Sequence, residues 1–168
     1  MLYFRTKLST LSRAMLFVFV LLFGVFADDN RMILDGPEYP NIGDTITVTL
    51  SQADLTDSTI GYQVFLEYNP NNLVYIDFQY NHNLYTYCLI SEYTTQLDQT
   101  ISLGYAYCNM PWSPQVKEDG WLLKLRFRVL DDEVYVNFTD TDNLPPSVWA
   151  TTTPPHSLEP LFEPYHAY

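Results

Sequence analysis

An alternating segment over residues 60–68, followed directly by an Asn-Pro-Asn-Asn turn, constrains the fold more than any other part of this sequence. Apolar side chains recur there at every second position, at Ile60, Tyr62, Val64, Leu66 and Tyr68. Successive side chains of a β-strand point to opposite faces, so these five share one face, which we expect to be buried. The turn leads into a second apolar run at residues 73–76, and together they predict two consecutive strands.

Similar short segments recur along the chain, with turn residues between them. Residues 45–50 alternate strictly between threonine and an aliphatic side chain, and we expect a loop over residues 51–59. Further strands are expected at residues 32–34, 73–78, 84–90, 100–108, 121–130 and 134–138. No stretch shows helical periodicity, so the pattern predicts an all-β fold, a jelly-roll β-sandwich of about nine strands.

The N-terminus has the three parts of a signal peptide. Arg5, Lys7 and Arg13 form a basic leader, and an apolar stretch follows at residues 14–26. That stretch has about 13 residues, whereas a membrane-spanning helix needs roughly 20. We therefore predict cleavage after Ala27, a secreted extracellular chain, and no membrane span after cleavage. The alternative is an uncleaved N-terminal anchor.

The secreted chain is predicted to be strongly acidic. Residues 28–168 keep five of the eight basic residues and all twenty acidic ones, which gives a formal charge of −15. Nucleic-acid-binding proteins carry basic patches, so this charge argues against nucleic acid as a partner. It favours a soluble monomer. We place a single domain at residues 28–150.

The chain has two cysteines, Cys88 and Cys108, each in a Tyr-rich segment typical of a strand. An even number of cysteines in an oxidising compartment indicates a disulfide. If Tyr85 and Tyr87 face the core, alternation turns Cys88 outward, and the same parity turns Cys108 outward. The sulfurs are then predicted to meet across neighbouring strands. Closing a loop of about 20 residues stabilises a fold by roughly 3 kcal/mol in the chain-entropy model.

Prolines interrupt the pattern beyond residue 143. Proline donates no hydrogen bond to a β-ladder, so this region cannot form a central strand. We expect a short edge strand at residues 147–150 and an extended Pro-rich C-terminal tail over residues 151–168.

The strand at residues 121–130 carries a basic stripe. Its inner face has apolar side chains at every second position from Trp121 to Val129, and its outer face has Leu122 followed by Lys124, Arg126 and Arg128. Two interpretations stay open. The stripe either forms cross-strand pairs with acidic neighbours such as Glu67, or it forms a partner-binding surface with Gln63, Phe65 and Glu67.

Several motifs between residues 35 and 138 resemble the cohesin domain of cellulosome scaffolding proteins. They are Ile42-Gly43-Asp44-Thr45, residues 61–71 ending in Y-N-P-N, Leu73-Val74-Tyr75-Ile76, residues 101–106, and Asp119-Gly120-Trp121-Leu122 before L-K-L-R-F-R-V. The resemblance implies a nine-stranded jelly roll whose outer face binds a calcium-loaded dockerin helix pair. It implies that this face comprises strands 60–68, 84–90, 100–108 and 121–130, with Gly61, Gln63, Phe65, Lys124 and Arg126 at the docking surface.

No arrangement of side chains in the sequence indicates an enzyme, a metal site or a cofactor. A glycosidase needs two carboxyl groups roughly 5 to 10 Å apart across a cleft, and no acidic spacing singles out such a pair. Residues 131–133 and 140–143 are rich in oxygen ligands, which leaves structural calcium as an alternative to simple acidic turns. Trp112, in the turn M-P-W-S-P, is a candidate for stacking on a sugar, with Tyr80, Tyr85 and Trp149 as further rings.

We therefore expect a secreted, non-catalytic, cohesin-like module that binds an extracellular protein, with a dockerin-bearing protein as one candidate. One alternative is a carbohydrate-binding module for polysaccharide, and another is a structural component of an extracellular surface. A docking surface predicts that Gln63, Phe65, Lys124 and Arg126 are exposed and coplanar. A sugar site predicts two or three exposed rings in a line.

Overall fold

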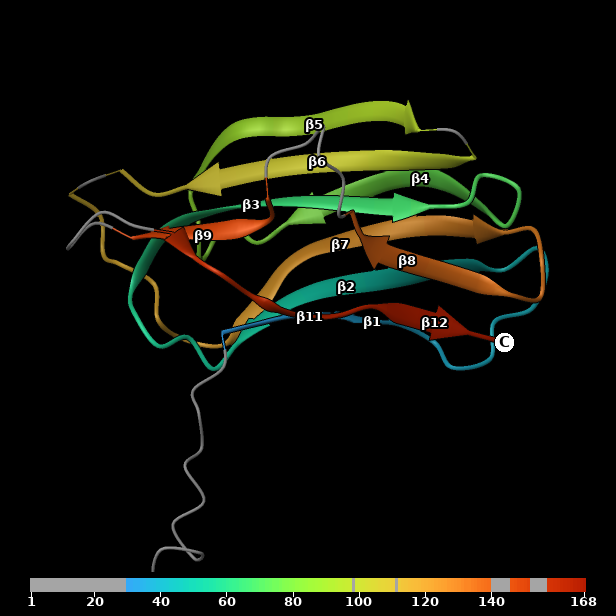
Figure 1. Cartoon of the computed structure of the whole chain (residues 1–168), viewed down its shortest axis with the longest axis horizontal. Coiled ribbons are helices and arrows are strands. Elements are labelled where there is room, and N and C mark those ends of the chain that lie inside the picture. Colours follow the sequence, from blue (N-terminus) through green and yellow to red (C-terminus); the bar gives the residue numbers. More distant parts are fainter. Residues whose placement is uncertain (1–29, 98, 111, 140–145, 152–156) are drawn as a thin grey trace, which may run out of the picture.

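A computed structural model describes residues 30–97, 99–110, 112–139, 146–151 and 157–168 of the chain, without the side chains at 88–93 and 97. The described chain forms two β-sheets packed face to face (Figure 1). Sheet A has the order β11 (Leu161–Glu163), β1 (Arg31–Asp35), β2 (Thr45–Ala53), β7 (Gly120–Val129), β4 (Leu73–Tyr80). Sheet B has the order β10 (Ser157–Leu158), β9 (Val148–Thr151), β3 (Thr59–Tyr68), β6 (Thr100–Cys108), β5 (Tyr87–Leu97). In sheet B, β8 (Val134–Phe138) also pairs with β3, and β12 (Tyr165–Ala167) pairs with β8.

The core lies between the inner faces of the two sheets, as the alternating pattern predicted. On β2 the side chains of Ile46, Val48 and Leu50 are buried, and on β3 the buried set is Tyr62, Val64, Leu66 and Tyr68. Large rings fill the middle of the sandwich, with Tyr68 packed edge-on against Phe127 at a centroid distance of 5.2 Å. Alternation therefore places apolar side chains from both sheets into one continuous core.

Several strand boundaries differ from the sequence prediction. The strand expected at residues 84–90 begins only at Tyr87 and runs on to Leu97. β2 extends to Ala53 into the expected loop, and β4 extends to Tyr80. Tyr85 precedes β5 and is buried, whereas Tyr87, which we expected to face the core, is 42% exposed. Burial raises the pKa of Tyr85 to about 12, and its hydroxyl donates to Gln52 Oε1 at 3.1 Å. A buried polar contact of this kind explains why a tyrosine outside any strand is held in the core.

A β-bulge at the start of β7 changes which side chains face the core there, compared with the prediction from alternation. The β2–β7 register shifts between Leu50 and Ser51, which leaves Leu122 without a direct partner on β2. An extra residue reverses the alternation beyond it. Leu122 is therefore buried, and Trp121, expected in the core, is half-buried with the Lys124 ammonium 4.7 Å from its ring centre.

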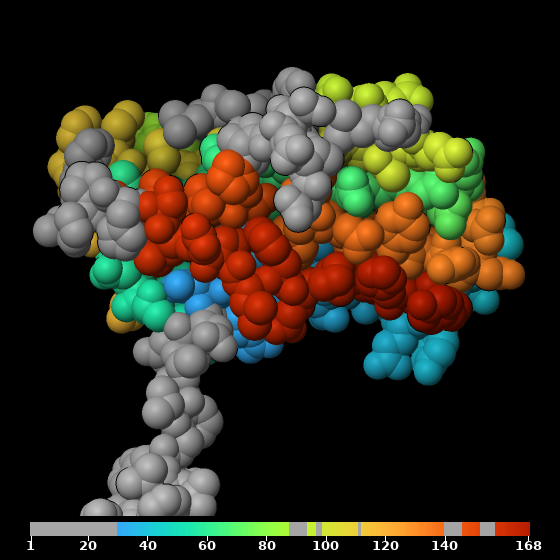
Figure 2. Space-filling view, viewed as in Figure 1, coloured from blue at the N-terminus to red at the C-terminus, as the bar shows by residue number. Residues whose placement is uncertain are grey.

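The C-terminal residues 157–167, which we expected to form part of an extended tail, are instead three short strands of the sandwich. β10 pairs with β9, β11 runs parallel to β1, and β12 pairs with β8. β9, expected as an edge strand, lies between β3 and β10. Figure 2 shows this red C-terminal segment crossing one side of the molecule. The expectation failed because Pro160 and Pro164 lie between the short strands, where no ladder hydrogen bond is needed.

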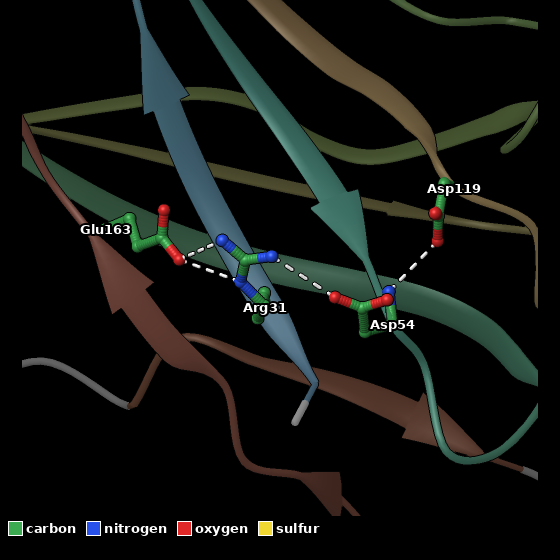
Figure 3. A network of polar contacts seen from close by, with 4 residues as sticks. All are labelled: Arg31, Asp54, Asp119 and Glu163. Atoms are coloured by element: carbon green, nitrogen blue, oxygen red, sulfur yellow. Dashed lines mark hydrogen bonds and ion pairs between the residues drawn. The ribbon is translucent and has the colours of Figure 1, made fainter. Parts of the chain in front are cut away.

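Two contacts hold this segment in place. The Tyr165 hydroxyl donates to the Pro37 carbonyl oxygen at 2.6 Å. Arg31 on β1 donates through Nε to Glu163 on β11 at 2.7 Å and also pairs with Asp54 after β2 (Figure 3). These hydrogen bonds raise the pKa of Arg31 above its ordinary value. The C-terminal strands are therefore part of the folded domain.

Candidate protein-interaction face

The residues predicted for partner binding do not lie on one surface. Gln63, Phe65 and Glu67 belong to β3 in sheet B, whereas the basic residues Lys124, Arg126 and Arg128 belong to β7 in sheet A. Both sets point away from the core, but on opposite sides of the sandwich. The expected coplanar surface is therefore wrong, and so is the expected pairing of the stripe with Glu67. Alternation shows on which side of its own strand a residue lies, but not which sheet the strand joins.

The outer face of sheet B along β3 and β6 is mostly uncharged, with small side chains on β6. In the β3–β6 register Gly61 lies opposite Cys108, Gln63 opposite Ala106, and Phe65 opposite Gly104. Glu67 lies opposite Ser102 at one end. None of the described strands of sheet B contains Lys or Arg. This face therefore offers backbone, methyl and amide groups rather than positive charge.

A hollow of about 530 Å³ lies over the end of this face formed by β9, β3 and β6. Its lining includes Gly61, Gln63, Ala106, Val148 and Ala150. A Cβ atom at Gly61 would lie 2.7 Å from the Tyr107 carbonyl oxygen, too close for any other residue without a shift of backbone. The close strand approach at this glycine, with alanines beside it, leaves the hollow open to solvent.

Two strands, β8 and β9, pair with the same edge of β3 on either side of Phe65. Between them Thr139 N donates to the Phe65 carbonyl oxygen at 2.9 Å, and Phe65 N donates to Ser147 Oγ at 2.9 Å. Gln63 Nε2 donates to the Pro146 carbonyl oxygen at 2.7 Å. Thr139 and Ser147 are thus held along the edge of β3, and Pro146 is held by the outward side chain of Gln63.

These contacts change the expected roles of two residues. Phe65 points outward from β3, yet only 8% of it is exposed. Gln63 lines the hollow but uses its amide to hold Pro146. Neither contact could be predicted from local sequence, because the partners are more than 80 residues further along the chain.

Glu67 is the charged residue of the predicted set on this face. It lies on β3 opposite Ser102 and opposite Asn137 of β8. Burial raises the pKa of the Glu67 carboxyl group. The structure therefore places a partly desolvated carboxylate at the β8 end of the face and the uncharged hollow at the β9 end.

The outer face of sheet A differs in kind. Arg126 pairs with Asp77 on the neighbouring strand β4, with Nε donating to Oδ1 at 2.6 Å. This pair raises the pKa of Arg126 and lowers that of Asp77. Cross-strand pairing, one of our two interpretations, therefore holds for Arg126, with Asp77 in place of Glu67. Arg128 is exposed and Lys124 lies over Trp121.

The predicted disulfide depends on Cys88, whose side chain lies outside the described part of the structure. The backbone register pairs Cys88 with Tyr107, and Tyr87 with Cys108, so the cysteines occupy adjacent strands but not opposed positions. The disulfide stays a prediction.

The aromatic residues considered for a sugar site are mostly buried. Tyr85 and Trp149 belong to the core at 1% and 0% exposure, and Tyr80 stacks on Tyr107 with ring centres 4.3 Å apart. Trp112 is 80% exposed, as its turn predicted. Of the predicted platform, a single exposed ring therefore remains.

The oxygen-rich segments considered for calcium fall in two parts of the chain. Residues 140–143 lie outside the described residues. Asp131 and Asp132 follow β7 and are exposed. Within the described ranges no three His, Cys, Asp or Glu side chains gather as metal ligands.

The described ranges contain no helix of the length and hydropathy that crossing a membrane requires.

Comparison by sequence finds no match to this chain, either among protein-family models or among curated proteins. Comparison of structures finds cohesin modules. A Clostridium thermocellum cohesin solved as the Coh-OlpC-Doc435 complex has a TM-score of 0.62 at 12% identity, over 83% of this chain and 92% of that chain. The sixth cohesin of Acetivibrio cellulolyticus scaffoldin B, solved with a Cel5 dockerin, has a TM-score of 0.61 at 10% identity, over 83% and 97%.

A third similar structure is a cohesin module that belongs to a glycoside hydrolase. The cohesin module of a Clostridium perfringens family 33 glycoside hydrolase has a TM-score of 0.54 at 9% identity, over 83% of this chain and 95% of that chain. The likeness covers nearly the whole of each cohesin module, at identities that carry information on fold alone. The predicted resemblance is thereby confirmed for the fold: this is a cohesin-like jelly-roll sandwich.

Proposed function

We propose that this chain is a secreted, non-catalytic module that binds another extracellular protein on the outer face of sheet B. The hollow beside Gly61 carries the proposal, because it is an uncharged, mostly apolar depression on a rigid sheet. Interfaces are depleted of charge at their centre and place their strongest contacts in pockets of this kind.

The fold likeness supports a protein partner. Two of the similar cohesin modules were solved in complex with a dockerin. The resemblance in sequence implies docking on a sheet face that includes β3, β5 and β6, and these strands do lie together in sheet B. A partner with an apolar side chain for the hollow and a basic residue near Glu67 complements this face. A dockerin-bearing protein is the specific candidate.

The test measures capture of a protein from the host's extracellular fraction by the secreted chain. The decisive variant is Ala150→Trp, which fills the hollow from an exposed position on β9. Its matched control is Thr47→Trp, the same enlargement at an exposed position on sheet A. We expect Ala150→Trp to weaken the captured complex at least about tenfold, because anchor pockets dominate binding energy, and the control to bind like wild type.

Calcium dependence separates a dockerin from other protein partners. Calcium is held by oxygen ligands in helix-loop-helix modules, so a chelator unfolds or releases such a partner. Capture that survives the chelator, yet is lost in Ala150→Trp, supports a protein partner of another type. Equal capture by both tryptophan variants would overturn the proposed face. Retention on an insoluble neutral polysaccharide, lost on Trp112→Ala and with no protein captured, would favour the carbohydrate-binding alternative.

A further inference from the structure

The basic residues of the folded chain are concentrated on sheet A. Residues 30–168 contain five of them, and Lys124, Arg126 and Arg128 occupy alternate positions on the outer face of β7. Alternate residues of a strand lie about 7 Å apart, so three positive charges form a straight row about 14 Å long. The strands of sheet B carry no Lys or Arg in the described ranges. The two outer faces therefore differ strongly in charge.

Polar side chains flank this row. The β2–β7 register places Thr45, Thr47 and Thr49 opposite Arg128, Arg126 and Lys124. On the other side Gln79 of β4 lies opposite Lys124. A hollow of about 300 Å³ is lined by Thr47, Asp77, Phe78, Gln79, Lys124 and Arg126. The row is thus bordered by hydroxyl groups along β2, whereas on β4 the amide of Gln79 lies beside Lys124 and the exposed Val74 lies beside Arg128.

Two of the three cations are available to a ligand. Within the described residues, Lys124 and Arg128 form no ion pair, whereas Arg126 is held by Asp77. The Lys124 ammonium lies over the half-buried ring of Trp121, at the end of the row. This cation–π contact holds the Lys124 charge at that end of the row.

The remaining surface repels anions. The whole chain has a formal charge of −12 even with its basic leader. A charged surface steers ligands of opposite sign to its complementary patch. A polyanion is therefore directed to the β7 row, because the acidic remainder of the surface disfavours every other position.

The basic row is one strand wide, and this favours a thin ligand over a broad one. Carboxylates border it on both sides, Asp77 on β4 and Asp35 on β1, which pairs with Thr49. A broad acidic protein surface laid over β7 would meet these carboxylates as well. A thin linear chain on the β2 side of β7 contacts the cations and the threonine hydroxyl groups, while Asp77 lies on the β4 side and stays paired with Arg126.

From this arrangement we propose that the outer face of sheet A is a second binding site, for a linear acidic polysaccharide that lies along β7. The ligand's acidic groups pair with Lys124 and Arg128, and its hydroxyl groups contact the threonine row. This site is independent of the protein partner on sheet B. A molecule with both sites links a protein to a polyanionic extracellular matrix.

The test uses the secreted chain and polygalacturonate, a linear polyuronate, with dextran as the neutral polymer. Affinity electrophoresis at several salt concentrations measures the dissociation constant. The decisive variant is Lys124→Gln/Arg128→Gln, and Lys117→Glu away from the row is the control that lowers net charge by the same two units. We expect the double variant to bind polygalacturonate at least about tenfold more weakly, since it loses two charged contacts, with a weaker dependence on salt. The control is expected to change affinity less than about twofold.

A second variant tests the role of the carboxylate in the row. Asp77→Asn releases Arg126 from its ion pair, so we expect tighter binding to polygalacturonate. Unchanged binding in Lys124→Gln/Arg128→Gln would overturn the proposal, because the ligand would then not contact the row. An equal loss in Lys117→Glu would overturn it as well, because binding would then follow net charge alone. So would a lack of binding to polygalacturonate together with capture of an acidic protein through the same row. The variants change exposed or half-buried side chains, and thermal unfolding checks that each is folded.

Each of the two proposals can be contradicted without contradicting the other. Ala150→Trp is expected to leave polygalacturonate binding intact, and Lys124→Gln/Arg128→Gln is expected to leave protein capture intact. Loss of both activities in either variant would contradict independent faces.

Discussion

The two outer faces of this sandwich have the same β-sheet geometry but opposite surface character. On sheet A the outward positions of β7 carry long charged side chains that reach into solvent. On sheet B the outward positions of β3 and β6 carry mostly small or uncharged residues and a buried phenylalanine, with Glu67 as their charged residue. Strand alternation sets only whether a side chain points in or out. The outward residues, and the contacts that bury some of them, decide what a face can bind.

The largest expected difference between the faces concerns Phe65 and Arg126. Phe65→Ala is expected to lower the free energy of unfolding by about 3 kcal/mol, because it removes a buried ring and leaves a cavity. Arg126→Ala, its counterpart on sheet A, is expected to leave stability nearly unchanged because the ion pair is exposed. Urea denaturation measures both. If Phe65→Ala unfolds like wild type, Phe65 is exposed in solution and belongs to the partner-binding set that the sequence predicted.

The next effect concerns the close strand approach at Gly61. Gly61→Ala is expected to lower the free energy of unfolding by about 1–3 kcal/mol, because the new Cβ meets backbone that cannot move away cheaply. Ala150→Ser, at the exposed neighbouring position on β9, is the control and is expected to unfold like wild type. Equal midpoints for the two variants in urea would show that β3 and β6 separate easily at this point.

A smaller and pH-dependent effect is expected at Asp77 on sheet A. Its hydrogen bond with Arg126 lowers the pKa of Asp77, so the pair stabilises the fold above the ordinary value of about 3.9, and this stability is lost as pH falls through the lowered pKa. Wild type is therefore expected to be more stable than Asp77→Asn at neutral pH, with a difference that disappears in acid. Thermal unfolding between neutral and acidic pH measures it. A difference that stays constant with pH would show that the carboxylate charge is not responsible.

The smallest effect, of opposite sign, is expected at Glu67 on sheet B. Burial raises its pKa, so its ionised form opposes folding at neutral pH, and this cost disappears below the ordinary value of about 4.3. Glu67→Gln is therefore expected to be slightly more stable than wild type at neutral pH and equally stable in acid. The same unfolding series checks it. A variant less stable than wild type at neutral pH would show that the carboxylate makes a stabilising contact.

Most of the strands could be predicted from the sequence. β3, β6 and β8 lie within one residue of their expected bounds, because alternation and turn residues are local signals. The cohesin-like fold followed from short motifs at the turns and is confirmed by solved structures of similar shape. Exposure of Trp112 also followed from its turn.

The candidate site was predicted only in part, and the failures share a cause. We correctly predicted from alternation that Gln63 and Lys124 point away from the core, but we wrongly expected them on one surface. The sheet to which a strand belongs depends on pairing with residues far away, such as β7 with β2 and β3 with β6. The bulge that turns Trp121 outward arises from the same long-range register.

The amino-acid sequence was sufficient to determine the alternation that builds the core, the turns between strands and the acidic charge. Tertiary structure alone decided which faces exist, that Phe65 is covered, and that residues 157–167 complete both sheets. The reason is physical. Side-chain direction and turn conformation depend on near neighbours, whereas strand order and the burial of an outward residue depend on hydrogen bonds between segments that only the folded chain brings together.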